Sequence, residues 1–289
     1  MNSQPILAVI GGSGLYNFPS LENTESIEVK TPYGKPSSPI ILGTLSGKRI
    51  AFLARHGIGH IYMPSEVNYR ANIYALKKIG IKQIVSISAC GSLREDYSPG
   101  HIVIPNQLVD FTRNRPHTFF GEGIVVHIGT ANPFCENLSD YVYKAVLKTG
   151  ATVHKGGTYI AIEGPRFSTK AESNLFREWG MSIIGMTTCP EAILAREAEL
   201  CYATMAHITD YDVWHINEKP VTVEMVVKVL KRNTEIAQKA IKNLVEILPQ
   251  ETTCDCKNAL KNAIMTKADL IPDQARKKVG LFIDKYLGK

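Results

Sequence analysis

The chain has 289 residues, of which 44% are hydrophobic. This length suits one large α/β domain or two small ones, because single cores rarely grow beyond about 250–300 residues. The net charge of +6 and the pI of about 8.9 are compatible with either a small anion or a nucleic acid as a ligand. No stretch approaches the ~18 consecutive apolar residues of a membrane span or has the pattern of a secretory leader, so we expect a soluble, cytoplasmic protein without a membrane partner.

Short apolar runs predict strands, and the first, at 6–10, leads directly into the turn Gly11-Gly12-Ser13-Gly14. Further strands are expected at 50–53, 84–88, 102–104, 159–162, 183–186 and 202–208. Apolar residues three and four apart predict helices at 67–79, 138–147, 171–179, 192–200 and 222–248. This alternation predicts the α/β class, with a mixed or parallel sheet covered by helices on both faces.

One polar linker interrupts this pattern at 250–256, after Pro249, and a new apolar helix is expected from Leu260 onward. We therefore expect a catalytic domain over 1–249 and a C-terminal helical extension of the same domain over 250–289. Basic residues of the extension are interleaved with Leu, Ile and Val at helical spacing, which is typical of a solvated amphipathic face.

The cysteines predict mostly free thiols. Apolar surroundings favour buried thiols at Cys90, Cys135, Cys189 and Cys201. The pair in Cys254-Asp255-Cys256 stands apart, because a lone C-x-C lacks the second ligand pair of a zinc site. A redox-active or strained disulfide between Cys254 and Cys256 is the alternative.

The glycine turn after the first strand does not match the dinucleotide-binding fingerprint, because Asn17 stands where the third glycine belongs. The turn can instead direct successive backbone N–H groups and the Ser13 hydroxyl toward one anion. A purely structural turn is the other interpretation.

A cluster of basic and aromatic nitrogen donors, Arg55, His56 and His60, follows the strand at 50–53. Arginine offers a planar fork of donors to phosphate, and histidines can add donors or protons. The two histidines could also bind a metal, but no carboxylate or thiolate in the segment completes such a site. We therefore favour phosphate.

Small residues follow two more strands, around Ser88 and Ala89 and again at Thr187. They let the backbone close on a ligand, although close packing would need them equally. In open α/β sheets ligands gather at the carboxyl ends of strands, which is where all of these segments lie.

Two carboxylates, Asp210 and Asp212, close the strand at 202–208. Residues two apart on an extended chain point to one face and lie about 6–7 Å apart, so both carboxylates could contact the same edge of a ligand. A magnesium site and a simple turn are alternatives. Carboxyl groups can accept from an exocyclic amine and, when protonated, donate to a ring nitrogen, which suits an adenine leaving group.

Seven motifs, in register from residue 6 to about 248, resemble the methylthioadenosine phosphorylases, which are trimeric members of the nucleoside phosphorylase superfamily. They are Gly11-Gly12-Ser13-Gly14-Leu15, Ala54-Arg55-His56-Gly57, Asn68-Tyr69-Arg70-Ala71-Asn72-Ile73, Ala89-Cys90-Gly91-Ser92-Leu93-Arg94, Ile162-Glu163-Gly164-Pro165-Arg166-Phe167-Ser168, Gly185-Met186-Thr187 and Thr209-Asp210-Tyr211-Asp212. The resemblance implies a nucleoside-phosphorylase-like mixed sheet, a homotrimer and possibly a dimer of trimers. Cys135 and Cys201 are paired in related thermophilic enzymes, so the resemblance also allows a disulfide there.

The resemblance assigns site residues position by position. The phosphate site falls on Ser13, Arg55, His56, His60, Ser88, Ala89 and Thr187, where the family often has threonine in place of Ser13 and Ser88. The purine pocket falls on Phe167, Ser168, Met186, Asp210 and Asp212, and the methylthio pocket on Val223, Val226, Val227 and, from a neighbouring subunit, His127. Phe167 is expected to stack on the base. Glu163 and Arg166 have either a site role or a structural one.

The reaction implied is phosphate-dependent cleavage of 5'-methylthioadenosine, with protonated Asp210 donating to the purine N7. Three valines would leave a 5'-hydroxyl unsatisfied, which favours a methylthio group. A phosphorylase for methylthioinosine or for purine nucleosides in general is the alternative, and a nucleosidase using water is a further one. No metal or organic cofactor is expected, and no stripe of aromatic and basic residues indicates a nucleic-acid partner.

Overall fold

The computed structural model describes residues 4–12, 18, 20–215 and 222–287, and for 225–232 it describes only the backbone. The helices and strands are β1 (Leu7–Gly11), β2 (Glu22–Ile27), β3 (Ile40–Leu45), β4 (Lys48–Ala54), α1 (Tyr69–Lys78), β5 (Gln83–Ser92), β6 (Ile102–Ile104), β7 (Gln107–Phe111), α2 (Glu136–Leu147), β8 (Val153–Lys155), β9 (Thr158–Ile162), α3 (Lys170–Glu178), β10 (Ile183–Gly185), α4 (Thr188–Glu197), β11 (Cys201–Asp210), α5 (Val223–Ile247), the short 3₁₀ helices η1 (Asp255–Asn258) and η2 (Ala268–Leu270), and α6 (Asp273–Leu287). Among these residues no helix is both long and apolar enough to cross a lipid bilayer.

The strands form one mixed sheet around β5. Its main path runs β2-β3-β4-β1-β5-β10-β9-β7, while β11 pairs with β5 and β6, and β8 pairs with β6. Strand β1 is parallel to β4 and β5, and β5 is parallel to β11, so the carboxyl ends of these four strands meet at one edge of the sheet. β1 pairs with 84–86 of β5 and β10 pairs with 91–92, so among the described residues 87–90 have no strand partner on that side.

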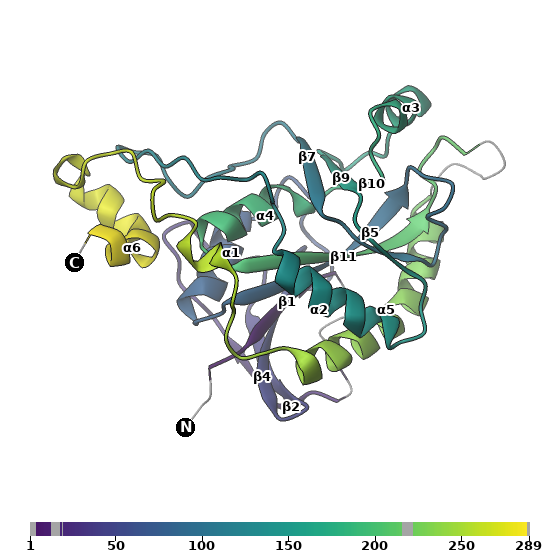
Figure 1. Cartoon of the computed structure of the whole chain (residues 1–289), viewed down its shortest axis with the longest axis horizontal. Helices are drawn as coiled ribbons and strands as arrows, with labels where there is room; N and C mark the ends of the chain where they lie inside the picture. The colour runs from purple at the N-terminus through teal and green to yellow at the C-terminus, as the bar shows by residue number, and fades with distance from the viewer. Residues whose placement is uncertain (1–3, 13–17, 19, 216–221, 288–289) are drawn as a thin grey trace.

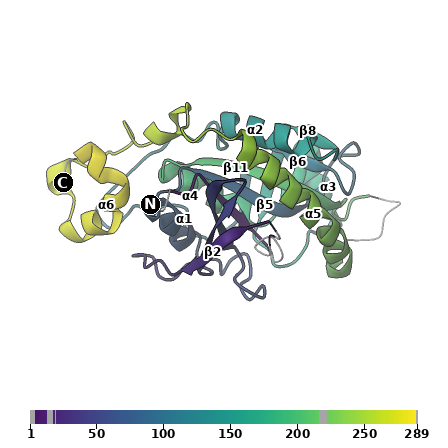
Figure 2. The same ribbon diagram turned by 90° about the horizontal axis from the view of Figure 1, so that it is seen from below.

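Helices cover both faces of the sheet, as the α/β prediction requires. In β1, Leu7 and Val9 pack in the core beneath α2 and α5, while Ala8 and Ile10 pack in the core beneath α1 and α4. This alternation explains why β1 reads as a continuous apolar run. Figures 1 and 2 show α2 and α5 side by side, and α6 at the opposite end of the molecule from α3.

The strands missed by sequence patterning are β2, β3, β7 and β8. β2 is exposed over nearly its whole length, and β7 and β8 are only partly buried, so none of these three carries a period-two apolar signal. The seven apolar runs all form strands, and β5 extends four residues beyond the predicted 84–88.

The expected helix from Leu260 is wrong, because α6 begins only at Asp273. Pro272 directly precedes it, and a proline cannot occupy a helix interior without breaking its hydrogen bonding. Leu260 is instead buried in a turn, where its backbone N–H donates to Glu199 Oε1 at 3.1 Å. α4 also differs from the predicted 192–200, since it starts at Thr188 with a break in helical geometry at Cys189 before Pro190.

All six cysteines are free thiols in the structure. The disulfide between Cys135 and Cys201 that the resemblance allows is therefore absent here, as is one between Cys254 and Cys256. The expectation that the C-x-C pair lacks a second pair of ligands is wrong, because the fold brings Cys135 and Cys201 to it.

Candidate active site

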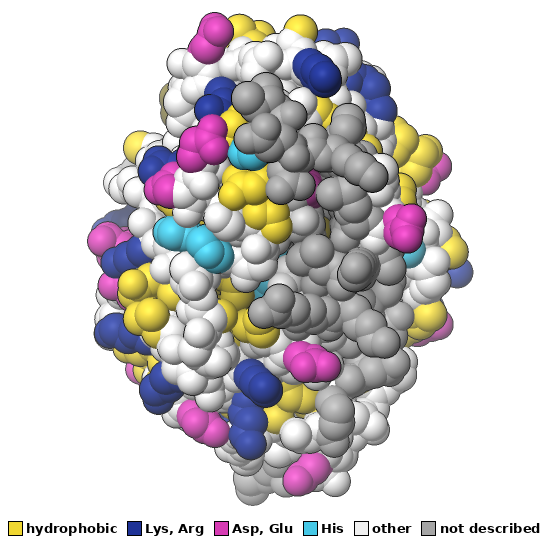
Figure 3. Space-filling view, turned by 90° about the vertical axis from the view of Figure 1, so that its right-hand side faces the viewer, with side chains coloured by type: hydrophobic (Ala, Val, Ile, Leu, Met, Phe, Trp, Pro, Cys, Tyr) yellow, Lys and Arg dark blue, Asp and Glu magenta, His cyan; other side chains and the backbone are white. Residues whose placement is uncertain are grey.

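The candidate site lies where the parallel strands β1, β4, β5 and β11 end. Arg55 directly follows β4, Ser88 and Ala89 lie in β5, and Asp210 is the last residue of β11. β10 runs antiparallel to β5, so the chain that leaves it brings Thr187 back toward Ser88. Figure 3 shows the surface on the side toward which β5 and β11 point in Figure 1, where hydrophobic and histidine side chains are interspersed with charged ones.

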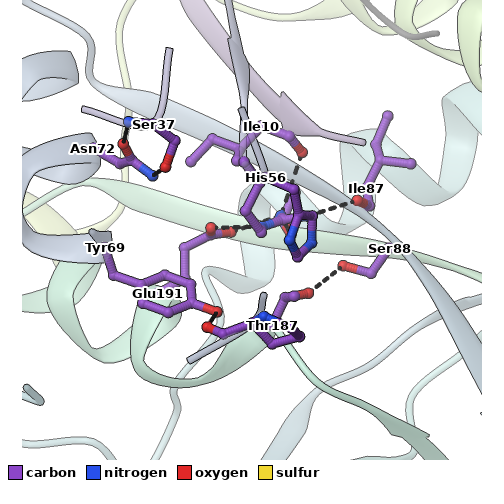
Figure 4. Close-up of polar contacts among 12 residues, drawn as sticks. Ile10, Ser37, His56, Tyr69, Asn72, Ile87, Ser88, Thr187 and Glu191 are labelled. Atoms are coloured by element: carbon purple, nitrogen blue, oxygen red, sulfur yellow. Dashed lines mark hydrogen bonds and ion pairs between the residues drawn. The ribbon is translucent and has the colours of Figure 1, made fainter. Parts of the chain in front are cut away.

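Arg55 is 2% exposed and makes a bidentate ion pair with Glu191. Its Nε and Nη2 each lie 2.8 Å from a Glu191 carboxylate oxygen. Nη2 also donates to Ser86 Oγ at 2.7 Å. Nη1 donates to the carbonyl of Ile87 at 3.1 Å, and Ile87 and Glu191 are labelled in Figure 4. The planar fork expected to face phosphate therefore faces Glu191, and among the described residues one N–H of Nη1 is left to a ligand.

His56 is neutral rather than cationic. Its Nδ1 lies 2.9 Å from the Tyr62 carbonyl, so Nδ1 carries the proton and Nε2 is left as an acceptor. Burial, and secondarily the charge of Arg55, lowers the pKa of His56 to about 4. The His60 ring stacks on it, with centroids 4.3 Å apart, and His60 itself has a left-handed backbone (φ 59°). His56 can thus accept a hydrogen bond from a protonated phosphate oxygen.

Two hydroxyls complete the described polar groups here. Ser88 Oγ lies 3.2 Å from Thr187 Oγ1, and both side chains are buried. Thr187 is the N-cap residue of α4, yet its side chain makes no capping bond and turns to Ser88 instead. Figure 4 shows the His56 ring, Ser88 and Thr187 facing the same space. Ser13, assigned to the same group, lies outside the described residues.

Asp210 and Asp212 are both 6% exposed, but the extended geometry expected between them is wrong. The strand has an irregularity between Ile208 and Asp210, and Asp212 adopts a left-handed backbone (φ 51°). The Asp212 N–H donates to Asp210 Oδ1 at 2.8 Å, which closes a local turn. An aspartate can bond to the backbone two residues on, and this bond replaces the straight continuation of the strand.

Burial raises the pKa of both carboxyl groups. For Asp210, the Thr209 hydroxyl at 2.6 Å and the Asp212 N–H oppose this rise, while the charge of Asp212 adds to it. For Asp212, the nearby hydroxyls of Ser173 and Ser168 oppose it, although neither of them reaches hydrogen-bond geometry with the carboxyl group. Asp212 Oδ2 is buried without a hydrogen-bond partner among the described residues. Both groups are therefore shifted toward the protonated form.

The remaining predicted pocket residues lie on the segment between β9 and α3 and after β10. Phe167 is 37% exposed, and the buried Ser168 hydroxyl has no hydrogen-bond partner among the described residues. Gly164 has φ 67°, and a Cβ there would lie 2.6 Å from Met186 Sδ, so this glycine permits the close approach of Met186.

Glu163 and Arg166 are both engaged in ion pairs. Glu163 Oε2 accepts from the backbone N–H of Arg113 at 2.6 Å, and its Oε1 lies 3.4 Å from Arg115 Nε. Arg166 forms a bidentate pair with Glu172 at the surface. These contacts favour the structural interpretation of both residues.

The methylthio pocket is described only in part. Val223, at the start of α5, is 68% exposed, while the side chains of Val226 and Val227 lie outside the described residues. The His127 side chain is exposed, and the backbone N–H of His127 donates to the Ala263 carbonyl at 2.8 Å. A single chain therefore leaves Val223 and His127 facing outward.

Sequence reasoning missed Glu191 and Arg115. Glu191 is fully buried and also accepts from the Tyr202 hydroxyl at 2.8 Å. Arg115 Nη1 donates to the Met186 carbonyl at 2.6 Å and to the Cys189 carbonyl at 2.7 Å, so it ties the pocket segments together. A lone carboxylate in the apolar stretch after Pro190 was the available signal for Glu191, since a buried charge needs a partner. Arg115 carries no comparable pattern.

Known proteins similar to the chain point to one family. Residues 6–246 match the Phosphorylase superfamily. The chain is 49% identical to S-methyl-5'-thioadenosine phosphorylase of Koribacter versatilis, over 99% of this chain and 98% of the relative, and 53% identical to that of Hyperthermus butylicus, over 90% and 95%. A methylthioadenosine phosphorylase from an antarctic soil metagenomic library has a similar structure, with a TM-score of 0.93, 43% identity and coverage of 97% and 100%. The Schistosoma mansoni enzyme in complex with adenine has a TM-score of 0.85 at 35% identity, with coverage of 92% and 100%.

Proposed function

Because the chain belongs to the phosphorylase superfamily and, within it, to the S-methyl-5'-thioadenosine phosphorylases, we propose that it uses inorganic phosphate to split S-methyl-5'-thioadenosine into adenine and 5-methylthioribose 1-phosphate. The observation that carries the proposal is the convergence, at one sheet edge, of the buried Ser88 and Thr187 hydroxyls and the buried His56 ring with two buried carboxyl groups of raised pKa. The first group suits an anion, and the second suits a leaving base.

Phosphate binds, in this proposal, between the hydroxyls of Ser88 and Thr187, the backbone of Ala89 and the rings of His56 and His60, with Ser13 adding a further hydroxyl. Arg55 supplies its remaining N–H and a positive charge that Glu191 largely balances. Arg55 mainly positions β5 next to the phosphate, through its hydrogen bonds to Ile87 and Ser86. The neutral Nε2 of His56 accepts a proton or a hydrogen bond from phosphate.

A phosphate oxygen then attacks the anomeric carbon as the bond from that carbon to the purine N9 breaks. The electron pair of the broken bond passes to the purine, and the Asp210 carboxyl donates its proton to N7. Asp212 accepts from the exocyclic amine of adenine, for which its unpartnered Oδ2 is suited. Phe167 stacks on the base, Met186 lies beneath the ribose, and Ser168 binds at the edge of the base. No metal or organic cofactor takes part.

The chain acts, in the same proposal, as a cytoplasmic homotrimer or a dimer of trimers. His127 of one subunit then joins Val223, Val226 and Val227 of another around the methylthio group. The exposure of His127 and Val223 in the single chain supports this arrangement. Sedimentation equilibrium tests it directly, and a monomer at assay concentration would contradict it.

The decisive experiment measures adenine release from S-methyl-5'-thioadenosine with and without phosphate. We expect turnover only with phosphate, and turnover in phosphate-free buffer would favour a nucleosidase. Initial rates on adenosine, methylthioinosine and inosine then rank the substrates. A preference for either inosine compound would contradict the adenine assignment and favour the general purine nucleoside alternative.

A further inference from the structure

Four of the six cysteines form one cluster at the end of β11 that is opposite to the active site. Cys201 is the first residue of β11, Cys135 is the N-cap of α2, and Cys254 and Cys256 flank the start of η1. The four sulfur atoms all lie within 4.8 Å of one another. Three of the residues are buried, and Cys254 is half-buried. Chain segments 53 and 119 residues away from Cys254 therefore bring two further thiols to the C-x-C pair.

The spacing of the sulfur atoms is nearer to that of a tetrahedral metal site than to that of a disulfide. Zinc binds thiolate at about 2.3 Å, which places the ligands of a tetrahedral site about 3.8 Å apart. The sulfur–sulfur distances are 3.6 Å for Cys135–Cys254 and 3.2 Å for Cys201–Cys254, both well beyond a disulfide bond and somewhat shorter than this separation. A disulfide requires about 2.05 Å and an oxidant to form, whereas zinc needs only the loss of the thiol protons to solvent. We propose that Cys135, Cys201, Cys254 and Cys256 form a structural zinc site.

The surroundings suit the charge of such a site. Zinc with four thiolates carries a net charge of −2, which needs compensation where water is excluded. Arg196 Nη1 donates to Cys256 Sγ at 3.5 Å and brings a positive charge. Cys135 lies at the N-terminus of the twelve-residue helix α2, where the helix dipole favours a thiolate. These are the outer contacts that orient the ligands of a metal site.

A metal ion can reach the cluster from solvent, and hydrogen bonds hold the segments that carry the cysteines in place. A surface depression lined by Cys135, Cys201, Cys254 and Thr252, among others, connects the cluster to solvent. The Cys135 N–H donates to the Tyr202 carbonyl at 2.8 Å, which fixes the start of α2 beside β11. Asn137 Nδ2 donates to Thr253 Oγ1 at 3.1 Å and holds the C-x-C segment against α2.

Zinc at this position fastens the C-terminal extension to the sheet. Beyond η1, the extension pairs with the segment before α2 through the bridge Val126–Ile264 and the bond from the His127 N–H to Ala263. The proposed cross-subunit residue His127 therefore lies on a segment that the extension supports. Loss of zinc is expected to loosen 253–266 first and the strip around His127 second.

The test measures metal content of the full-length protein purified anaerobically under a thiol-free reductant. Mass spectrometry of the metals is expected to give about one zinc per chain. The four cluster thiols should not react with a thiol reagent until the protein is unfolded. Cys135→Ser, Cys201→Ser, Cys254→Ser and Cys256→Ser should each lose most of the zinc. Cys90→Ala, which removes a buried thiol outside the cluster, is the matched control and should retain it.

A second measurement covers the case in which the variants fail to fold. Cobalt(II) added to zinc-depleted wild-type protein should give the intense visible bands of tetrahedral thiolate coordination. Hydrogen exchange should show faster exchange over 253–266 after zinc removal, reversed by adding zinc. The proposal is overturned if wild-type protein contains no zinc and regains none. It is equally overturned by one iron per chain, or by a mass lower by two hydrogens for each of two disulfides in protein never exposed to oxidant.

Discussion

The phosphate end of the site (Arg55, His56, Ser88 and Thr187) and its base end (Ser168, Asp210 and Asp212) differ in how completely their polar groups are paired. At the phosphate end, each side chain already has a partner within the protein: Glu191 for Arg55, the Tyr62 carbonyl for His56, and each other for Ser88 and Thr187. At the base end, Ser168 Oγ and Asp212 Oδ2 are buried without hydrogen-bond partners among the described residues.

The difference teaches how each end is prepared for its ligand. An unpaired buried polar group costs about 1–3 kcal/mol, so the base end is destabilised until a ligand satisfies it. The phosphate end is preorganised by its own network and needs little rearrangement when an anion arrives. Selectivity between substrates should therefore depend mainly on the base end. A base that leaves Asp212 without a hydrogen bond does not recover the free energy of pairing this buried group.

The largest expected effect concerns the base end. Asp210→Asn keeps the shape of the side chain but removes its acidic proton, so kcat should fall by about 10²–10⁴-fold. The dissociation constant for phosphate should change by less than about threefold, because the phosphate network does not include Asp210. Steady-state kinetics and calorimetric titration of phosphate measure the two quantities. A kcat within a few fold of wild type would remove Asp210 from the role of acid.

Asp212→Asn is the matched comparison for that variant. Its side chain turns from an acceptor into a partial donor, so the rate ratio between S-methyl-5'-thioadenosine and methylthioinosine should fall. If Asp210→Asn and Asp212→Asn instead lose kcat equally at an unchanged substrate ratio, the division of roles between the two carboxyl groups is wrong.

The next largest effect tests the preorganised network at the phosphate end. Glu191→Gln leaves the buried Arg55 charge uncompensated and should lower the free energy of unfolding by about 3–5 kcal/mol. Urea denaturation measures this loss. Glu172→Gln, which breaks the exposed pair with Arg166, is the control and should cost no more than about 1 kcal/mol. Equal losses in the two variants would show that burial does not distinguish the pairs.

A pH-dependent effect of intermediate size comes from His56. Its pKa in the folded protein is about 4, below the ordinary 6.5, because of burial and then of Arg55. As the pH falls, the unfolded chain takes up this proton first, so a stabilisation of about 3 kcal/mol present above pH 6.5 is lost between pH 6.5 and 4. His56→Asn keeps a donor for the Tyr62 carbonyl but does not titrate.

Denaturation of both proteins at pH 7.5 and pH 4 measures the difference. Wild type should lose more stability than His56→Asn over this interval. All other titrating groups are present in both proteins, so their contributions cancel in the comparison. Parallel pH profiles would mean that folding leaves the pKa of His56 at its ordinary value. His56 would then become cationic in the folded protein as the pH falls through about 6.5, and would not stay neutral as described above.

The sequence predicts the buried part of the fold and not its exposed part. β1 and β11 are visible as apolar runs because helices cover them on both faces. β2 is exposed and exists through its pairing with β3, a contact that no local pattern records. The wrong start of α6 has a local cause, since Pro272 in the printed sequence already marks the boundary.

The candidate site divides in the same way. Motifs identify Arg55, Ser88 and Asp210 because they follow strands, but they do not reveal that Arg55 is paired with Glu191 from α4. The relation of Asp210 to Asp212 depends on a left-handed backbone at a residue other than glycine, which spacing alone does not predict. The four-cysteine cluster likewise depends on tertiary contacts between β11, α2 and η1.

The smallest expected effect separates the two hydroxyls of the phosphate end. Ser88→Ala and Thr187→Val should each raise the KM for phosphate by about tenfold, the equivalent of one hydrogen bond of about 1.4 kcal/mol, with little change in kcat. Because the two oxygens lie 3.2 Å apart and bond to each other, the double variant should lose less than the product of the single losses. Ser139→Ala, a buried serine on α2, is the control and should leave the KM unchanged. Strictly multiplicative losses would mean that the hydroxyls act on phosphate independently, and the phosphate end would then be only partly preorganised.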